Sequence, residues 1–298
     1  MESVSKREKE ILRVTWIGSA VNFLLLAFKF VAGFVGHSSA MVADAVHSLS
    51  DFITDIIIVV FVRVSGKPRD PGHNYGYGKF ETLATAIIGV ILFIVGVGII
   101  INSIKEIVAV SQGAVLEAPS MLALTAAIVS IISKEIIYHY TISKGRALES
   151  KAVMANAWHH RSDALSSVGT MVGIGGAIFL GPEWRVLDPI SAFIVGLLII
   201  RVSIGIIKPC TDELLEKSLP NEVKNKILSI IVSHQDVSSP HNLRTRRIGS
   251  DIAIEVHIRM NGEISLKDAH EITKLIEASL KSEFGPNTYI GIHMEPLK

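Results

Sequence analysis

The sequence predicts an α-helical membrane protein, a six-transmembrane-helix bundle followed by a C-terminal cytosolic α+β domain. Hydrophobic residues make up 49% of the 298 residues and charged residues only 19%, against about 25% charged in a typical soluble domain. The segment from Leu83 to Ile104 has no charge and is long enough for a spanning helix, which needs about 20 apolar residues. After Lys208 the chain becomes charged and patterned. We therefore expect a transmembrane domain over 1–208 and a cytosolic domain over 209–298.

Six apolar segments predict the six spans. They lie near Thr15–Phe34, Met41–Val64, Leu83–Ile104, Met121–Tyr138, Ala164–Leu180 and Ile190–Ile207. Short loops with Gly, Ser and Pro, such as GHSSA and GPEWRVLDP, are typical of turns between antiparallel helices.

Basic residues near the span ends predict the orientation. They cluster before the first span, between the second and third, and between the fourth and fifth: Lys6, Arg7, Lys9, Arg13, Arg63, Lys67, Arg69, Lys79, Lys144, Arg146 and Lys151. Cytoplasmic loops carry an excess of Lys and Arg. We expect both termini in the cytoplasm and a multi-pass protein in the plasma (inner) membrane, in contact with membrane lipid.

The last ninety residues predict a small α+β unit. Ser265 and Asp268 have the spacing of a capping box and should open a helix that ends near Phe284. A second helix is expected after Pro220. The segments Asp251–Met260 and Tyr289–Glu295 alternate between apolar and polar residues, as half-buried strands do.

Charge and cysteine content exclude several classes. The net charge of +1, without a basic run interleaved with aromatics, argues against nucleic acid as a partner. The single cysteine, Cys210, excludes an internal disulfide framework and a cysteine-based zinc site within one chain.

Ionisable residues inside the apolar spans indicate a functional site, because burying them in a membrane costs several kcal/mol. Asp44, His47, Asp51 and Asp55 are spaced three, four and four apart in the second span, which places them on one helical stripe. The fifth span opens with His159 and Asp163, again four apart.

Two His-x-x-x-Asp pairs on facing helices would offer two imidazole nitrogens and two carboxylate oxygens. This four-coordinate set suits Zn²⁺. For the remaining carboxylates, Asp44 and Asp55, three roles stay open: proton relay, entry-path carboxylate, or partner of Lys29 or Lys134.

At this point the sequence resembles the cation diffusion facilitator family over almost its whole length. The matching stretches are SSAMVADAVHSLSDFITD, HNYGYGKFETLA, HHRSDALSS, HNLRTRR and IGIHMEP. The resemblance implies a homodimer with six spans per protomer, a metallochaperone-like cytosolic domain, and metal/proton antiport by alternating access.

Carried over by residue, the resemblance implies a transport site of His47, Asp51, His159 and Asp163, a combination similar to the zinc-transporting members. A second site of that family lies in the loop between the second and third spans. Asp70 and His73 match it, but Tyr77 stands where a second histidine would be, so this set is incomplete. The alternative to a metal site is a glycine-rich turn whose polar groups only cap the third span.

Two further features follow from the resemblance. Lys79 corresponds to a lysine that forms an interhelical salt bridge, with Glu216 or Asp212 as its expected partner. The cytosolic metal site is expected at His241, His257, His270, His293 and Glu295; solvated surface histidines are the alternative for this cluster.

The expected function is therefore efflux of a divalent cation, Zn²⁺ as substrate and as a possible regulatory ion, in exchange for protons. Fe²⁺, Mn²⁺, Cd²⁺ and Co²⁺ remain alternative cargoes. An integral-membrane metalloenzyme is disfavoured because the sequence has no HExxH and four ligands leave no open position for water. A passive channel or metal sensor without coupled transport is the other rival.

Overall fold

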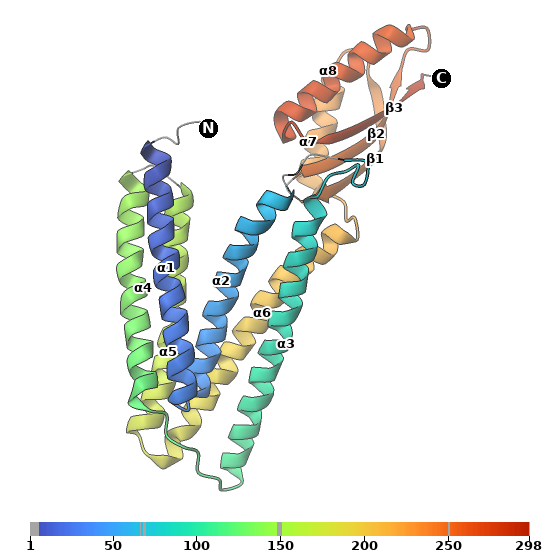
Figure 1. The fold of residues 1–298 in the computed structure, drawn as a ribbon. Coiled ribbons are helices and arrows are strands. Elements are labelled where there is room, and N and C mark those ends of the chain that lie inside the picture. The colour runs from blue at the N-terminus through green and yellow to red at the C-terminus, as the bar shows by residue number, and fades with distance from the viewer. Residues whose placement is uncertain (1–5, 66, 68–69, 148–150, 250, 298) are drawn as a thin grey trace. The chain divides into compact units, whose positions relative to one another are not determined.

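The computed structural model describes residues 6–65, 67, 70–147, 151–249 and 251–297. Six long helices come first: α1 (Lys6–Val35), α2 (Ser39–Ser65), α3 (Gly78–Ser111), α4 (Met121–Ala147), α5 (Lys151–Phe179) and α6 (Leu187–Leu214), with a short 3-10 helix at Pro182–Val186 before α6 (Figure 1). The C-terminal part contains α7 (Asn221–Val232), β1 (Ser238–Ile248), β2 (Asp251–Met260), α8 (Leu266–Phe284) and β3 (Tyr289–Pro296).

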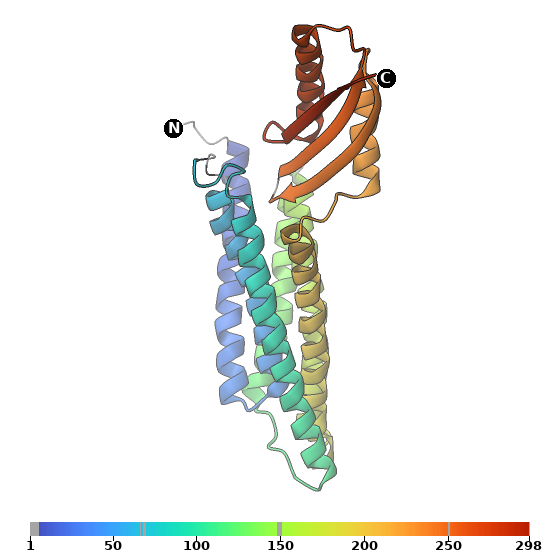
Figure 2. The same ribbon diagram turned by 90° about the vertical axis from the view of Figure 1, so that its right-hand side faces the viewer.

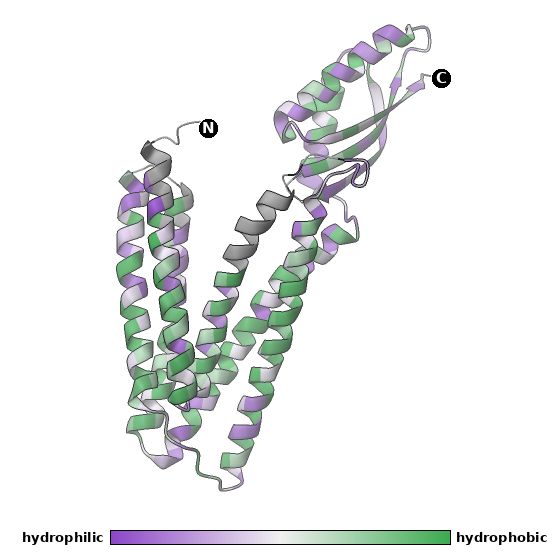
Figure 3. Cartoon of the chain, in the orientation of Figure 1, coloured by the Kyte–Doolittle hydropathy of each residue, from purple (hydrophilic) through white to green (hydrophobic). Residues whose placement is uncertain are grey.

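Four helical segments are long and apolar enough to cross a membrane, among the residues that the structure describes. They are Trp16–Val35, Gly78–Ser111, Met121–Ala147 and Pro182–Leu214. Apolar residues follow one another along α3, whereas polar and apolar residues mix over the C-terminal strands (Figure 3). The helices α2 and α5, with 27 and 29 residues, also have the length for a span but carry the ionisable residues.

The chain divides into two compact units. The helical unit comprises 1–56 and 89–204, and the C-terminal unit comprises 57–88 and 205–298. Several side chains named above lie outside the described ones: Lys6, Arg7, Lys9, Asp55, Arg63, Arg69 and Lys151.

Within the helical unit, α1, α4 and α5 run side by side (Figure 1). Small residues on α2 contribute to two apolar clusters. Ala40 and Met41 pack with residues of α1, α4 and α5, while Ala43 packs with Ala192 and other residues of α6. Because these small side chains allow close approach on both sides, the first part of α2 packs between the other helices of this unit.

The start of α2 is fixed by a carboxylate from another helix. Asp188 of α6 is buried and accepts hydrogen bonds from Ser38 Oγ (2.6 Å) and from the backbone N–H groups of Ser39 (2.7 Å) and Ala40 (3.3 Å). The first N–H groups of a helix have no partner within it. Asp188 supplies that partner for Ser39 and Ala40, and so helps to position α2 and the ionisable residues along it.

The C-terminal unit contains a three-stranded sheet of order β1-β2-β3, with β1 antiparallel and β3 parallel to β2. The helices α7 and α8 lie on the same side of the sheet (Figure 2). Their buried residues, Ile227 and Ile231 of α7 and Ile276 and Leu280 of α8, meet the apolar face of β2. From Ile254 to Met260 burial alternates along β2, and the half-buried polar residues Glu255, His257 and Arg259 lie on the face that these helices do not cover.

Ser265 caps α8 as expected: its Oγ accepts a hydrogen bond from the Asp268 N–H at 3.2 Å, and the helix ends at Phe284. The Asp268 carboxylate accepts from the Ser265 hydroxyl at 2.6 Å. The sequence pattern does not predict strand β1. Its sequence, SSPHNLRTRRI, does not alternate, and the pairing with β2 shifts register twice, with Ser239 and Asn242 at positive φ. The interruptions conceal the period of two on which strand prediction depends.

Candidate metal sites

The first candidate site lies between α2 and α5. His47 and Asp51 of α2 and Asp163 of α5 each place one ligand atom within 4.8 Å of the others. Asp163 is buried, with 6% of its surface exposed, and His47 and Asp51 are half-buried. The structure thus brings together three of the four residues expected at the transport site.

The fourth residue, His159, is one turn before Asp163 on α5. Its Nδ1 lies 3.8 Å from Asp163 Oδ1, and about half of its side chain (49%) is exposed. His159 also lines a cavity of about 20 Å³ together with Asp51 and Asp163. It is therefore adjacent to the cluster but does not converge with it as closely as the other three.

Two polar atoms of the cluster have no hydrogen-bond partner among the described residues: His47 Nδ1 and Asp51 Oδ2. An unsatisfied buried polar atom costs about 1–3 kcal/mol. A cation that accepts these lone pairs would remove that cost. The nitrogen and oxygen donors, their burial and their spacing together fit a divalent metal as cargo.

Asp44 lies on the same stripe of α2 but belongs to a different group. Its Oδ2 is 2.6 Å from Lys29 Nζ on α1, and its Oδ1 accepts a hydrogen bond from Ser167 Oγ at 3.0 Å. The other buried lysine, Lys134 of α4, lies 3.2 Å from Asp163 Oδ2. Of the roles left open for Asp44, the structure gives the Lys29 partner.

The loop before α3 is closed by its own side chains. Asp70 Oδ1 accepts hydrogen bonds from the N–H groups of Gly72 (2.9 Å) and His73 (2.7 Å), and Tyr77 donates its hydroxyl to Asp70 Oδ2. The Tyr77 hydrogen bond, followed by those from the backbone, lowers the pKa of Asp70. The same contact raises the pKa of Tyr77. His73 Nδ1 is 3.6 Å from Asp70 Oδ1, so both residues of the expected loop site are neighbours.

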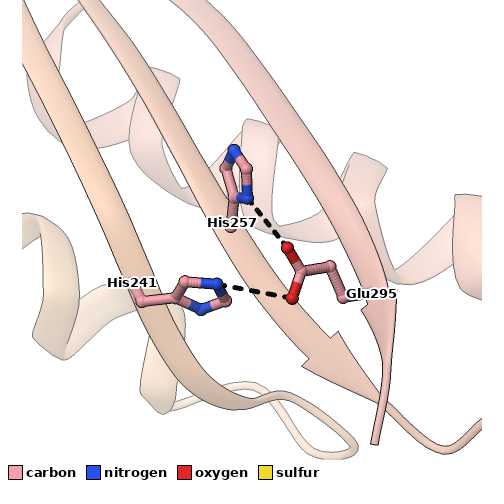
Figure 4. A group of neighbouring side chains, drawn as sticks. All are labelled: His241, His257 and Glu295. Atoms are coloured by element: carbon pink, nitrogen blue, oxygen red, sulfur yellow. Dashed lines mark hydrogen bonds and ion pairs between the residues drawn. The ribbon is translucent and has the colours of Figure 1, made fainter.

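The second candidate site lies on the polar face of the sheet. Glu295 of β3 is placed between two imidazoles: its Oε1 is 3.0 Å from His257 Nδ1, and its Oε2 is 3.4 Å from His241 Nε2 (Figure 4). One ligand atom of each lies within 4.8 Å of the others. The hydrogen bond from His257, reinforced by the charge of His241 and by Arg259, lowers the pKa of Glu295. The carboxylate is thus held between two imidazoles in a form that favours its charge.

The strand register explains this convergence. His241, His257 and His293 are paired across the three strands, so their side chains share one face of the sheet. The His257 and His293 rings lie 4.6 Å apart between centroids. His270 is exposed on α8, which packs against the opposite face of the sheet, and it is not part of this cluster among the described residues.

The C-terminal unit also contains the expected lysine contact. Lys79 Nζ, in the first turn of α3, lies 3.0 Å from Glu216 Oε1, and Arg246 of β1 lies 3.8 Å from Glu216 Oε2. Lys79, more than Arg246, lowers the pKa of Glu216. The alternative partner, Asp212, pairs with Lys217 instead.

Sequence reasoning missed the rest of this junction. Glu213 accepts hydrogen bonds from Thr82 Oγ1 (2.8 Å) and from the Gly249 N–H (2.7 Å). Gly78 lies so close to β1 that an added Cβ would be 2.5 Å from the Ile248 carbonyl oxygen. The glycine that opens α3 is therefore required by a long-range contact, for which local sequence gives no signal.

Comparison with known proteins supports this architecture. The family described as the cation efflux transmembrane domain matches residues 15–215, and the cytoplasmic domain of cation efflux proteins matches residues 219–297. The chain is 33% identical over 296 residues to the manganese efflux system protein MneP of Bacillus subtilis, with 98% of each chain covered. It is 31% identical to metal tolerance protein C1 of Arabidopsis thaliana, covering 99% of this chain and 64% of that protein.

Magnetosome protein MamB of a Magnetospira strain is also similar, with 30% identity over 96% of this chain and 95% of that protein. The two family matches together cover nearly all of the chain and both of its parts. We conclude that the protein is a multi-pass membrane transporter of divalent metal cations, not an enzyme, and that it belongs to the cation diffusion facilitator family.

Proposed function

We propose that this transporter exports Zn²⁺ from the cytoplasm in exchange for protons, with His47, Asp51, His159 and Asp163 as its transport site. The observation that carries the proposal is the convergence of His47, Asp51 and Asp163 from two helices to within 4.8 Å. Among the described residues, no other cluster of metal-ligating side chains lies in the helical unit. The cargo would therefore be held between α2 and α5.

The donor set favours zinc. Two imidazoles and two carboxylates match the N and O ligands that Zn²⁺ takes in tetrahedral sites. Mn²⁺ is the second candidate, since the relative MneP is named for manganese efflux and carboxylates suit Mn²⁺ better than imidazoles do. Two histidines in the site weigh toward zinc.

Exchange for protons follows from the ligand chemistry. An imidazole must be neutral to bind a metal, so metal binding and protonation exclude each other at the same nitrogen. Imidazoles also change charge within the pH range of living cells. Alternating exposure of the site to the two sides of the membrane would then couple metal export to proton entry.

We further propose six spans with both termini in the cytoplasm, and a homodimer. The start of α3 and the end of α6 belong to the same compact unit as the sheet, which supports placing these ends on the cytosolic side. Dimerisation rests on the family resemblance. The domain boundary at residue 208 stays a prediction.

The residues His241, His257 and Glu295 fit a second, resident metal. Their donors are nitrogen and oxygen atoms, and one carboxylate already lies between both imidazoles. A metal bound there would crosslink β1, β2 and β3, and His293 lies beside them in the strand register. We propose that this cytosolic site regulates transport by stabilising the domain.

Transport assays with single metals test the cargo. The purified full-length protein, reconstituted in proteoliposomes, is expected to take up Zn²⁺ at lower concentrations than Mn²⁺ under the same imposed pH gradient. Uptake of both metals should be lost in Asp51→Ala and kept in His234→Ala, a histidine that contacts Ser279 outside both candidate sites. A clear preference for Mn²⁺ would replace zinc as the cargo and leave the site intact.

A further inference from the structure

A buried lysine holds one of the candidate transport ligands. Lys134 of α4 is 4% exposed, and its Nζ lies 3.2 Å from Asp163 Oδ2. The other oxygen of Asp163 faces His159 at 3.8 Å. The carboxylate that would bind the metal therefore already has a cation on one side and an imidazole on the other.

The lysine and the proposed cargo compete for one small space. Lys134 lines the same cavity of about 20 Å³ as Asp51, His159 and Asp163. A volume of about 10–15 Å³ is what one water requires, so the cavity has room for a single small particle. An ion that enters it lies beside the ammonium group, and both are attracted to the same carboxylate.

We infer that Lys134 is a tethered cation that neutralises Asp163 in the empty transporter and is displaced from it when the divalent metal binds. The inference rests on the proposed transport site. It adds a specific role for a residue of α4, a helix that provides none of the four proposed ligands.

Two physical consequences follow. With the ammonium in place, the empty site does not contain an uncompensated buried carboxylate at Asp163, which would be strongly unfavourable. When the metal is bound, repulsion between the metal and the nearby ammonium is weakly screened in a low-dielectric interior. Lys134 therefore lowers the affinity for the metal and favours its release, which a carrier needs and a storage site does not.

The second buried lysine provides a matched control. Lys29 is fully buried and forms a comparable ion pair with Asp44. Its Nζ also donates to Ser48 Oγ (3.1 Å) and Ser167 Oγ (3.3 Å). Asp44 is not part of the converging cluster. The Lys29 charge is therefore paired with a carboxylate outside the proposed transport site.

The test is zinc uptake by the full-length protein in proteoliposomes, with the half-saturating zinc concentration and the maximal rate measured separately. In Lys134→Met the half-saturating concentration is expected to fall about tenfold, equivalent to about 1.4 kcal/mol, while the maximal rate also falls because release slows. Lys134→Arg retains the charge and should keep the wild-type concentration dependence. Lys29→Met should not tighten zinc binding.

A purely structural role predicts a different pattern. Loss of structure lowers the maximal rate without lowering the half-saturating concentration, and that result in a folded Lys134→Met would overturn the inference. Should the methionine variant fail to fold, Lys134→Gln, which can still donate a hydrogen bond to Asp163, decides by the same criterion. Asp51→Ala distinguishes failure of the proposed transport site from failure of the lysine's role. Uptake that survives Asp51→Ala contradicts the transport site itself. If Asp51→Ala abolishes uptake but Lys134→Gln leaves the half-saturating zinc concentration unchanged, only the role of Lys134 is contradicted.

Discussion

Lys29 Nζ lies 2.6 Å from Asp44 Oδ2, and both side chains are almost completely buried between α1 and α2. Ser167 of α5 donates to the same carboxylate. Three helices of the helical unit therefore meet at one ion pair, a turn away from the candidate transport residue His47.

Removing one partner of this pair should destabilise the protein strongly. Asp44→Ala leaves the Lys29 ammonium buried without its counter-ion, which costs about 3–5 kcal/mol. The measurement is the free energy of unfolding in detergent micelles. The double variant Lys29→Met with Asp44→Leu, which removes both charges, should recover most of the loss. A loss in the double variant equal to the sum of the losses in Lys29→Met and Asp44→Leu would show that the charges are not coupled.

The Lys79–Glu216 pair should stabilise the protein in a pH-dependent way. The pKa of Glu216 is lowered in the folded protein, chiefly by the hydrogen bond from Lys79. A lowered carboxyl pKa gives a contribution that is complete above the unfolded value, about 4.3, and is lost as the pH falls through the folded value. Because the pair is exposed, the contribution is about 0.2–1 kcal/mol.

The comparison of wild type with Glu216→Gln measures the contribution of the Lys79–Glu216 pair to the free energy of unfolding. The difference in the free energy of unfolding should be constant from pH 6 to pH 8, should shrink as the pH falls below about 4.3, and should vanish once the pH is below the lowered pKa of Glu216 in the folded protein. A difference that grows as the pH falls would have the wrong sign and would contradict the pair.

The loop before α3 should gain a metal site from one substitution. Asp70 and His73 are already neighbours, and Tyr77 stands at the position expected for the third ligand, where it donates a hydrogen bond to Asp70. Tyr77→His replaces that donor with an imidazole and completes an Asp and two-His set that suits Zn²⁺. One additional zinc ion per chain is expected by equilibrium dialysis. Tyr77→Phe, which removes the hydroxyl and adds no ligand, should bind no more zinc than wild type.

The cytosolic cluster should depend on Glu295. Glu295→Gln keeps the size of the side chain but removes the charge that lies between His241 and His257. Zinc affinity at this site should fall at least about tenfold, because even the loss of a residue that only hydrogen-bonds a metal ligand usually costs about that much. Isothermal titration of the full-length protein measures it, with His234→Ala as the surface-histidine control. Unchanged affinity would remove Glu295 from the site, and unchanged metal-dependent transport would remove its regulatory role.

Helix periods and intramembrane charges made most of this architecture predictable from sequence. His47, Asp51 and Asp163 could be grouped because the spacing of four places each pair on one helical face. The pairing of Lys29 with Asp44, and of Lys134 with Asp163, could not be chosen in advance, since either lysine could reach either carboxylate until the helices were packed. In β1, register shifts conceal the strand pattern, and the need for Gly78 arises from a carbonyl far along the chain.

The most direct test of the central claim is zinc uptake into proteoliposomes with an imposed pH gradient, comparing wild type with Asp51→Ala and Asp163→Ala. We predict gradient-dependent uptake in wild type, loss of uptake when the gradient is collapsed, and loss in both variants. Uptake that persists without a gradient would indicate an uncoupled pore. Uptake unaffected by either substitution would contradict the transport site between α2 and α5.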